Sequence, residues 1–187
     1  MTEPAAVLPA IFVPSGGRDP VRLSDPSVGL LLRDLDLFAL QTAAESGRPL
    51  LAVDLDSVEG LGADAAAVSF VVERLGIGIV MTRRPALAKR AADLGAFGLA
   101  HVFAFDSTGL GRSLDAHPGG PGVGTVISPG PVLTHISPQD RARIPRPLVA
   151  YGLIGTPERA VALLRLADAV VVRAEHAASV AAMLRRG

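Results

Sequence analysis

The sequence predicts an α/β protein, a compact parallel (β/α)8 barrel of the TIM type folded as a single domain. Two patterns indicate this fold. Short β-type runs alternate with longer Ala- and Leu-rich runs along the whole chain, which gives eight strand–helix units. The short runs, such as Leu50–Leu55, are continuously apolar, as is typical of strands covered on both faces of a parallel sheet. A doubly wound open sheet is the alternative.

The length of 187 residues is small for such a barrel, because barrels usually have about 250 residues and rarely fewer than 200. Connections of two to five residues, as between Gly47 and Leu50, allow eight units to fit. We therefore expect residues 1–187 to form one barrel domain. A chain of this size buries about 70% of its unfolded surface, so it needs no disulfide or metal for stability.

The expected strands are the apolar runs between turn signals. The first strand is followed by almost no helix, and each of the others by a helical run. In chain order, the strands are Val7–Phe12, Val28–Leu32, Leu50–Leu55, Gly76–Thr82, Phe97–Phe105, Gly124–Ile127, Pro147–Tyr151 and Asp168–Val172.

The first three expected helices have clear signals. Asp34–Ser46 ends at a glycine, and Ala63–Arg74 has apolar residues spaced by three and four. Pro85–Leu94 begins with proline and is followed by glycine, the usual asymmetry of a helix.

The later helices have weaker signals. Two glycines weaken Ser107–Ala116, and Pro138 interrupts Val132–Arg141. Pro157–Leu166 and Glu175–Arg186 complete the set. The Gly- and Pro-rich segment 117–124 cannot hold a helix, and we expect a floppy connector at the bottom of the barrel.

The composition excludes several functions. With no cysteine, the chain has no disulfide scaffold, thiolate metal site or cysteine nucleophile. Aromatic residues make up 4% of the chain and tryptophan is absent, so a base-stacking platform is hard to build. The 18 basic and 18 acidic residues balance, so any nucleic-acid contact must come from a local patch. No apolar run approaches the roughly 20 residues of a membrane span, which predicts a cytoplasmic protein without membrane contact.

Candidate site residues lie where strands end, because function gathers there in a parallel barrel. At the seventh junction, Gly152 and Gly155 allow close approach of a ligand, and Thr156 can cap a helix whose N-terminus suits an anion. Any strand-to-helix turn, however, also needs glycine and a cap. The junction is therefore a candidate phosphate site.

The acidic residues after the third strand, Asp54, Asp56 and Glu59, have two interpretations. They suit acid–base chemistry or Mg²⁺, or they cap the next helix. Asp106 is a candidate cap as well, and His101 is expected to be a buried histidine with a hydrogen-bond partner. No metal-ligand spacing, Walker loop or Ser/His/Asp set occurs, so the chain has no signature of catalysis and no metal site is expected.

Two basic clusters could contact RNA phosphates or form a solvated surface. One consists of Arg83, Arg84, Lys89 and Arg90 at the fourth strand–helix turn. The other consists of Arg141, Arg143 and Arg146, which precede the seventh strand and so lie on the opposite rim.

The order of several short motifs resembles that of the glycerol-3-phosphate-responsive antiterminator family. The resemblance covers nearly the whole chain, from Leu8 to the last helix. The matching stretches are LPAI at 8–11, VDL at 53–55, GLGADAAAVSFV at 60–71, GIGIVMTR at 76–83 with the pair AK at 88–89, VFAFDS at 102–107, SPG at 128–130 and YGLIGTPE at 151–158.

The resemblance implies a small (β/α)8 barrel that binds glycerol 3-phosphate as effector and needs no other cofactor. The liganded protein would act on the leader of a glycerol-utilisation mRNA and prevent transcription termination. For such an RNA partner, the basic cluster at the fourth turn predicts contacts at Arg84, Lys89 and Arg90. By position, the ligand site of the family falls on Asp54, Thr82, Arg83, Asp106, Gly130, Gly152 and Gly155, with Thr156 beside them.

This sequence departs from the usual family pattern at Ala52, His101 and Tyr151, and at the eighth-strand turn, Val172–Glu175. We expect Arg173 in that turn to supply a charge to the ligand. Two other functions stay open: a small barrel enzyme acting on a phosphorylated substrate with Asp54 and Asp106 as acid and base, and a non-catalytic interaction module. A homo-oligomer is compatible with all three.

Overall fold

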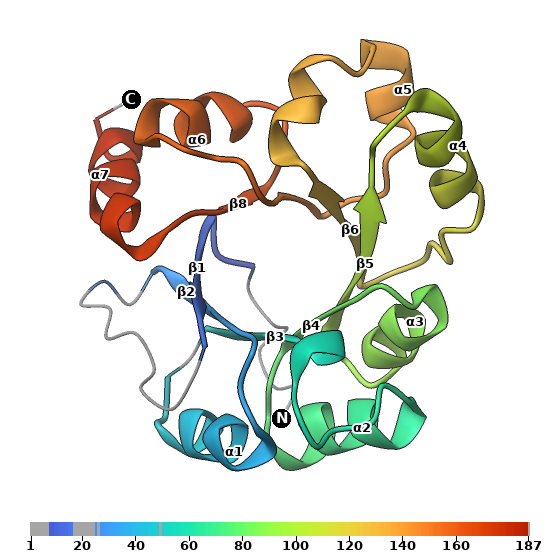
Figure 1. The fold of residues 1–187 in the computed structure, drawn as a ribbon, viewed down its shortest axis with the longest axis vertical. Helices are drawn as coiled ribbons and strands as arrows, with labels where there is room; N and C mark the ends of the chain where they lie inside the picture. Colours follow the sequence, from blue (N-terminus) through green and yellow to red (C-terminus); the bar gives the residue numbers. More distant parts are fainter. Residues whose placement is uncertain (1–7, 17–24, 26, 49, 187) are drawn as a thin grey trace.

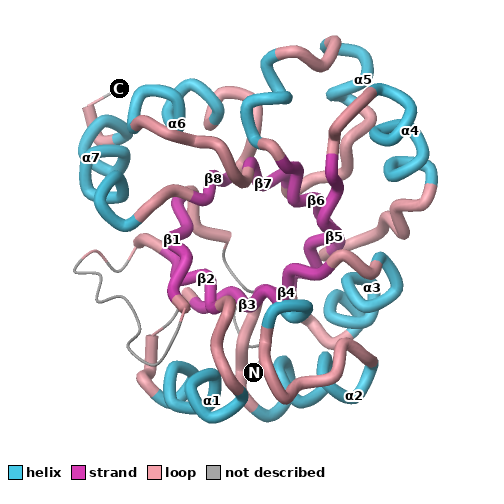
Figure 2. Tube along the Cα trace, in the orientation of Figure 1, coloured by secondary structure: helices cyan, strands magenta, loops and turns pink. Residues whose placement is uncertain are grey.

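Eight parallel strands form a closed barrel in the order β1 to β8, surrounded by helices (Figures 1 and 2). The structure is a computed structural model that describes residues 8–16, 25, 27–48 and 50–186. Each strand pairs in parallel with its sequence neighbours, and β1 closes onto β8 through Ile11 beside Val170 and Phe12 beside Val171. The predicted barrel is confirmed, and the open sheet is excluded by the β1–β8 pairing.

The strands are short and leave little chain for the connections. They are β1 (Ile11–Ser15), β2 (Gly29–Leu32), β3 (Leu51–Asp54), β4 (Ile79–Thr82), β5 (Phe97–Phe103), β6 (Val123–Ser128), β7 (Leu148–Ala150) and β8 (Ala169–Val171).

Most helices of the described chain begin within a few residues of a strand end. They are α1 (Leu37–Glu45), α2 (Ala65–Ser69), α3 (Pro85–Asp93), α4 (Ser107–Asp115), α5 (Pro138–Ala142), α6 (Pro157–Leu163) and α7 (Ala174–Leu184). A π-helical turn (Phe70–Arg74) continues α2, and 3-10 turns follow β3 (Leu55–Ser57) and β6 (Gly130–Thr134).

The first strand differs from its prediction because it begins at Ile11 and includes Pro14. The Phe12 carbonyl accepts a backbone hydrogen bond from Val172, the residue directly after β8. Pro14 lies two residues further along β1, so the side of its backbone that lacks an N–H faces the same stretch of chain. Since β8 ends at Val171, no partner loses a hydrogen bond there. The predicted start at Val7, Gly17 of the first turn, and most of the connection to β2 lie outside the described residues.

The helix predicted at Val132–Arg141 is divided in two, with a 3-10 turn before α5. Pro138 is the first residue of α5, where its missing N–H is tolerated, and the Ser137 side chain caps this helix.

Segment 117–124, expected to be a floppy connector, is organised around His117. The His117 ring contacts the Gly124 carbonyl at 3.1 Å and accepts a hydrogen bond from the Gly119 N–H at 3.1 Å.

The core has an inner and an outer layer, and the side chains of successive strand residues point alternately into one and the other. The inner layer fills the barrel and is made of one residue or two from each strand, among them Leu31, Ala52, Met81 and Leu99. The outer layer packs the alternate residues, such as Val53 and Val80, against the helices. Among the described residues, no helix is long and apolar enough to cross a membrane.

Candidate functional site

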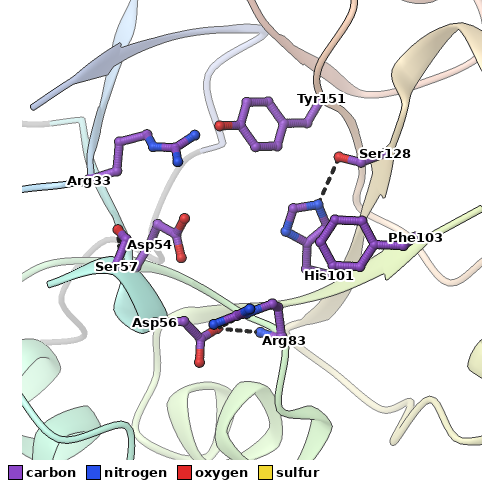
Figure 3. A pocket seen from close by; sticks show the side chains of 9 residues that line it. All are labelled: Arg33, Asp54, Asp56, Ser57, Arg83, His101, Phe103, Ser128 and Tyr151. Carbon is purple, nitrogen blue, oxygen red and sulfur yellow. Dashed lines mark hydrogen bonds and ion pairs between the residues drawn. The ribbon is translucent and has the colours of Figure 1, made fainter.

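A polar cavity of about 300 Å³ opens at the carboxyl ends of the strands (Figure 3). Its side chains come from β2 through β7 or from the residues that directly follow these strands. They are Arg33, Asp54, Asp56, Ser57, Arg83, His101, Phe103, Ser128 and Tyr151. The cavity therefore occupies the end of the barrel at which the sequence placed the candidate site.

Strand geometry explains why these residues share the cavity. Successive side chains on a strand point to opposite faces, so a residue two positions beyond an inner-layer residue points inward again. Arg33 follows Leu31 by two, and Arg83 follows Met81 by two. The same relation links the inner-layer residues Ala52, Leu99, Val126 and Val149 to Asp54, His101, Ser128 and Tyr151. The cavity is thus a polar layer on top of the apolar interior.

Arginine and aspartate side chains pair along one side of the cavity. Arg33 pairs with Asp34 at 2.7 Å, and its guanidinium carbon lies 5.7 Å from the centre of the Tyr151 ring. Asp56 accepts a hydrogen bond from the Arg83 backbone N–H at 2.6 Å and lies 3.6 Å from its guanidinium. The Asp56 side chain is only 5% exposed, so this contact fixes the start of the chain after β4.

Asp54 is the carboxylate at the end of β3 on the floor of the cavity (Figure 3). Burial raises its pKa above the ordinary value, and the neighbouring carboxylates of Asp56 and Asp34 act in the same direction, whereas Arg33 opposes the rise. A carboxyl group held in this way accepts hydrogen bonds from hydroxyl groups of a ligand.

His101 forms the opposite wall of the cavity. Its Nε2 shares a hydrogen bond of 2.8 Å with the Ser128 hydroxyl, as expected of a buried histidine with a partner. Burial, together with the positive charges of Arg83 and Arg33, lowers the pKa of His101 to about 4, although Asp56 opposes the shift. The ring is therefore neutral at pH 7 and contributes no positive charge to the cavity.

A second hollow of about 530 Å³ lies between the ends of β7 and β8. It shares Tyr151 with the first cavity, and Arg159 and Arg173 are its two charged lining residues. Its loop turns through positive φ angles at Gly152 (76°) and Leu153 (56°), a conformation that costs energy for leucine. Arg173 is held by Glu175 at 3.2 Å and by His176 at 3.0 Å.

The structure divides the predicted ligand residues among three environments. Asp54 and Arg83 line the cavity, whereas Gly152, Gly155 and Arg173 line the second hollow.

Thr82, Asp106, Gly130 and Thr156 line neither space. Thr82 comes directly after the inner-layer residue Met81, so its side chain points to the outer layer. Its hydroxyl accepts a hydrogen bond from the Arg84 N–H at 3.2 Å. Asp106 and Thr156 cap α4 and α6. Gly130 joins the loop after β6 to the loop after β7, because its N–H donates to the Tyr151 carbonyl at 2.7 Å.

The predicted RNA-contacting residues lie on or beside α3. Arg84 precedes α3, lies 4.0 Å from Asp56 and donates to the Ala63 carbonyl. Lys89 pairs with Asp93 one turn later, and Arg90 donates to the Ser69 hydroxyl at 3.0 Å. All three thus contact groups of this chain while remaining at its surface.

Sequence reasoning missed Arg33 and Ser57, and it did not assign Asp56, His101, Phe103, Ser128 or Tyr151 to the ligand site. One signal could have found part of this set. His101 and Phe103 alternate along β5 with small or apolar residues. A polar or aromatic residue at every second position near a strand end indicates the open mouth of a barrel.

A closed (β/α)8 barrel with a polar cavity at the carboxyl ends of its strands belongs to the class of TIM-type barrels, whose functional sites lie at this end. Residues 24–176 match the family model described as glycerol-3-phosphate responsive antiterminator. The chain therefore belongs to the glycerol-3-phosphate responsive antiterminator family. No curated protein matches the sequence.

Solved structures show the same fold. A glycerol uptake operon antiterminator-related protein from Thermotoga maritima is 23% identical, with a TM-score of 0.68 over 90% of this chain and 96% of that one. A glycerol uptake operon antiterminator regulatory protein from Listeria monocytogenes is 17% identical, with a TM-score of 0.73 over 90% and 94%. An aldolase, QR15, is 12% identical, with a TM-score of 0.54 over 78% and 77%.

Proposed function

We propose that this protein is a non-catalytic regulator that binds glycerol 3-phosphate. With the effector bound, it acts on the leader of a glycerol-utilisation mRNA so that a terminator hairpin does not stop transcription. Family membership supports the effector and the RNA target. The polarity of the two neighbouring spaces at the barrel mouth supports the way in which the effector is held.

The charge difference between the two spaces carries the proposal. The cavity holds the carboxylates of Asp54 and Asp56 against the guanidinium groups of Arg33 and Arg83, so it has no excess positive charge. The second hollow has Arg159 and Arg173 and no acidic lining residue. Glu175, which lies outside the lining, pairs with Arg173 at 3.2 Å, so the excess positive charge of the hollow comes mainly from Arg159. An anion therefore favours the hollow, where two guanidinium groups can donate charge-assisted hydrogen bonds.

A phosphorylated polyol matches this arrangement. Its phosphate would lie in the hollow near Arg159 and Arg173, and its hydroxyl groups would reach past Tyr151 toward Asp54. Carboxylates accept hydrogen bonds from the hydroxyls of a glycerol chain, and the hydroxyls of Ser57 and Ser128 can both donate and accept them.

The observed placement does not support the enzymatic alternative. Asp54 lines the cavity, but Asp106 caps α4 by accepting the Gly109 N–H at 2.6 Å, so the two carboxylates do not form an acid–base pair there. A Schiff-base aldolase needs a lysine in the barrel. Lys89, the one lysine of the sequence, is on α3 and pairs with Asp93.

Thermal unfolding with and without glycerol 3-phosphate tests effector binding. A ligand at 100 times its dissociation constant adds about 2.7 kcal/mol of stability. That gain raises the Tm of a domain of this size by roughly 5–10 °C. Glycerol and inorganic phosphate, tested separately at the same concentration, should give much smaller shifts because each fills one space. The absence of any shift at millimolar glycerol 3-phosphate would reject the effector.

Transcription in vitro tests the regulatory half. On a template that carries the leader and terminator of a glycerol-utilisation operon, the protein with glycerol 3-phosphate should increase read-through. The protein alone should not. Phosphorus NMR of the same mixture should show unchanged glycerol 3-phosphate after prolonged incubation, and its conversion to a product would contradict a non-catalytic role.

A further inference from the structure

Two phenylalanine rings are exposed at the end of β5, beside the cavity. Phe103 is 40% exposed and Phe105 is 83% exposed. Their rings are nearly parallel, with an angle of 6° and centroids 5.9 Å apart. His101 stacks on Phe103 at 4.4 Å and 20°. We call His101, Phe103 and Phe105 the aromatic ladder.

Strand geometry produces the ladder. His101, Phe103 and Phe105 lie at alternate positions along β5 and its extension, so their side chains share one face. The alternate residues Val102 and Ala104 belong to the outer core. The ladder therefore leads from the cavity wall, where His101 and Phe103 lie, to the solvent at Phe105.

An exposed phenylalanine with one ring stacked on it leaves a flat apolar face in water that a further flat group can cover. Phenylalanine gains most when its large apolar surface is buried, and it prefers stacked or edge-to-face aromatic partners. Phe105 already adopts a parallel stack with Phe103 and leaves most of its own surface in water. The geometry thus provides room for one more flat ring in the series.

We propose that the aromatic ladder is a stacking surface for bases of single-stranded RNA. This inference rests on the proposed function, because it presupposes an RNA partner and adds the place where its bases bind. Every base has a flat face, and stacking on exposed aromatic rings is how single-stranded RNA is commonly held.

Nearby positive charge favours RNA over a protein partner. Arg83 lines the same cavity as Phe103, and its side chain is 61% exposed. Arg84, the next residue, is 57% exposed. Both guanidinium groups also lie within 4.0 Å of Asp56, and their exposed parts suit contacts with a phosphate backbone. A stable protein interface instead buries about 800 Å² on each partner around an apolar centre, more than two rings provide.

The ladder also places the RNA next to the effector. Because Phe103 and His101 line the cavity, a ligand there would contact the inner end of the ladder directly. Affinity for RNA should therefore change when glycerol 3-phosphate binds, and the two ligands must affect each other by the same factor.

Fluorescence anisotropy with the full chain tests the proposal. The probes are the glycerol-operon leader RNA and a labelled uridine oligomer of about 12 nucleotides. Phe105→Ala should weaken binding of both about 5- to 100-fold, the range observed for loss of one base stack. Phe105→Trp should restore binding. An oligomer of equal charge without bases should bind wild type weakly and should not distinguish it from Phe105→Ala.

Phe38→Ala is the matched control, since Phe38 is 77% exposed but belongs to α1. It should leave RNA affinity unchanged. Equal RNA affinity of wild type and Phe105→Ala would overturn the ladder proposal while leaving the proposed function intact. If wild type binds neither probe with or without effector, the ladder and the RNA half of the proposed function both fail, and the thermal shift still tests the effector separately. A Phe105→Ala variant that only dissociates an oligomer in sedimentation would overturn the proposal in favour of self-association.

Discussion

The Nε2 atom of His101 on β5 lies 2.8 Å from the Ser128 hydroxyl at the end of β6. This hydrogen bond joins two neighbouring strands across the wall of the cavity. It fixes the imidazole at the inner end of the aromatic ladder, where the ring lines the cavity and stacks on Phe103. A charged imidazole in this place would lose solvation and face Arg83 and Arg33, so the neutral form is favoured.

The low pKa of His101 makes stability depend on pH in a defined direction. The pKa falls from 6.5 to about 4 in the folded state. Between these two pH values the unfolded chain binds the proton more tightly than the folded protein does. The contribution of His101 to the free energy of unfolding is therefore fully present above about pH 6.5 and decreases as the pH falls toward 4. The total loss is up to ~3 kcal/mol. His101→Gln should flatten the curve of Tm against pH over this window.

The control is His135→Gln, a change at an exposed histidine that should leave the curve unchanged. A His101→Gln variant with the same slope as wild type would show that the buried ring is not responsible for acid sensitivity.

Asp54 should affect stability in the opposite direction. Its pKa is raised by burial, so in the folded state it holds its proton to a higher pH than the unfolded chain does. Stability therefore falls as the pH rises through the interval between the two pKa values, and the ionised carboxylate weakens the fold at pH 7. Asp54→Asn should raise the Tm at pH 7 by a few degrees at most, and the gain should disappear near pH 3.

The same variant should bind glycerol 3-phosphate less tightly, because a neutral amide is a weaker acceptor for hydroxyl groups. Differential scanning fluorimetry measures both effects. A lower Tm at pH 7 combined with unchanged effector binding would contradict the assigned position of Asp54 on the cavity floor.

Gly98 and Gly111 provide a test of packing. A Cβ at Gly98 would lie 1.7 Å from the Ala88 carbonyl oxygen, because α3 packs directly on β5. Gly98→Ala must displace backbone and should cost at least ~2–3 kcal/mol. A Cβ at Gly111 in α4 meets no atom within 4 Å, so Gly111→Ala should stabilise the protein by about 0.5–1 kcal/mol. Urea unfolding measures both, and a Gly98→Ala variant as stable as wild type would contradict the α3–β5 packing.

Arg159 and Arg173 should control affinity for the phosphate group. Loss of one charge-assisted contact costs about 1.5–3 kcal/mol, which corresponds to roughly 10- to 100-fold weaker binding. Arg159→Ala and Arg173→Ala should each reduce the thermal shift produced by glycerol 3-phosphate. Arg165→Ala is the control, since this exposed arginine follows the other end of α6. Equal shifts in all three variants and wild type would place the phosphate outside the second hollow.

The sequence by itself predicted the barrel, with an open sheet as the alternative, and the end of the barrel at which the candidate site lies. The order of strands and helices was readable because each strand is a continuous apolar run and several helices begin with a capping residue or proline, as at Thr156 and Pro85. The caps at Asp106 and Thr156 were recognised for the same local reason, since a cap depends on residues only three positions away. The positions of Asp54 and Arg83 in the cavity followed from their place at strand ends.

Only the tertiary structure decided which side chains at those ends share a space. Most of the strands are buried on both faces and have no polar–apolar alternation, so, apart from the end of β5, their sequences do not reveal which residues point into the barrel. Closure of β1 onto β8 fixes the register and thereby turns Arg33, His101 and Tyr151 inward, while Thr82 faces the helices. The barrel also brings the centroid of the Tyr151 ring to 5.7 Å from that of the His101 ring, although these two residues come from different strands. Contacts between residues far apart in the chain depend on this register, and a single sequence has no local signal for it.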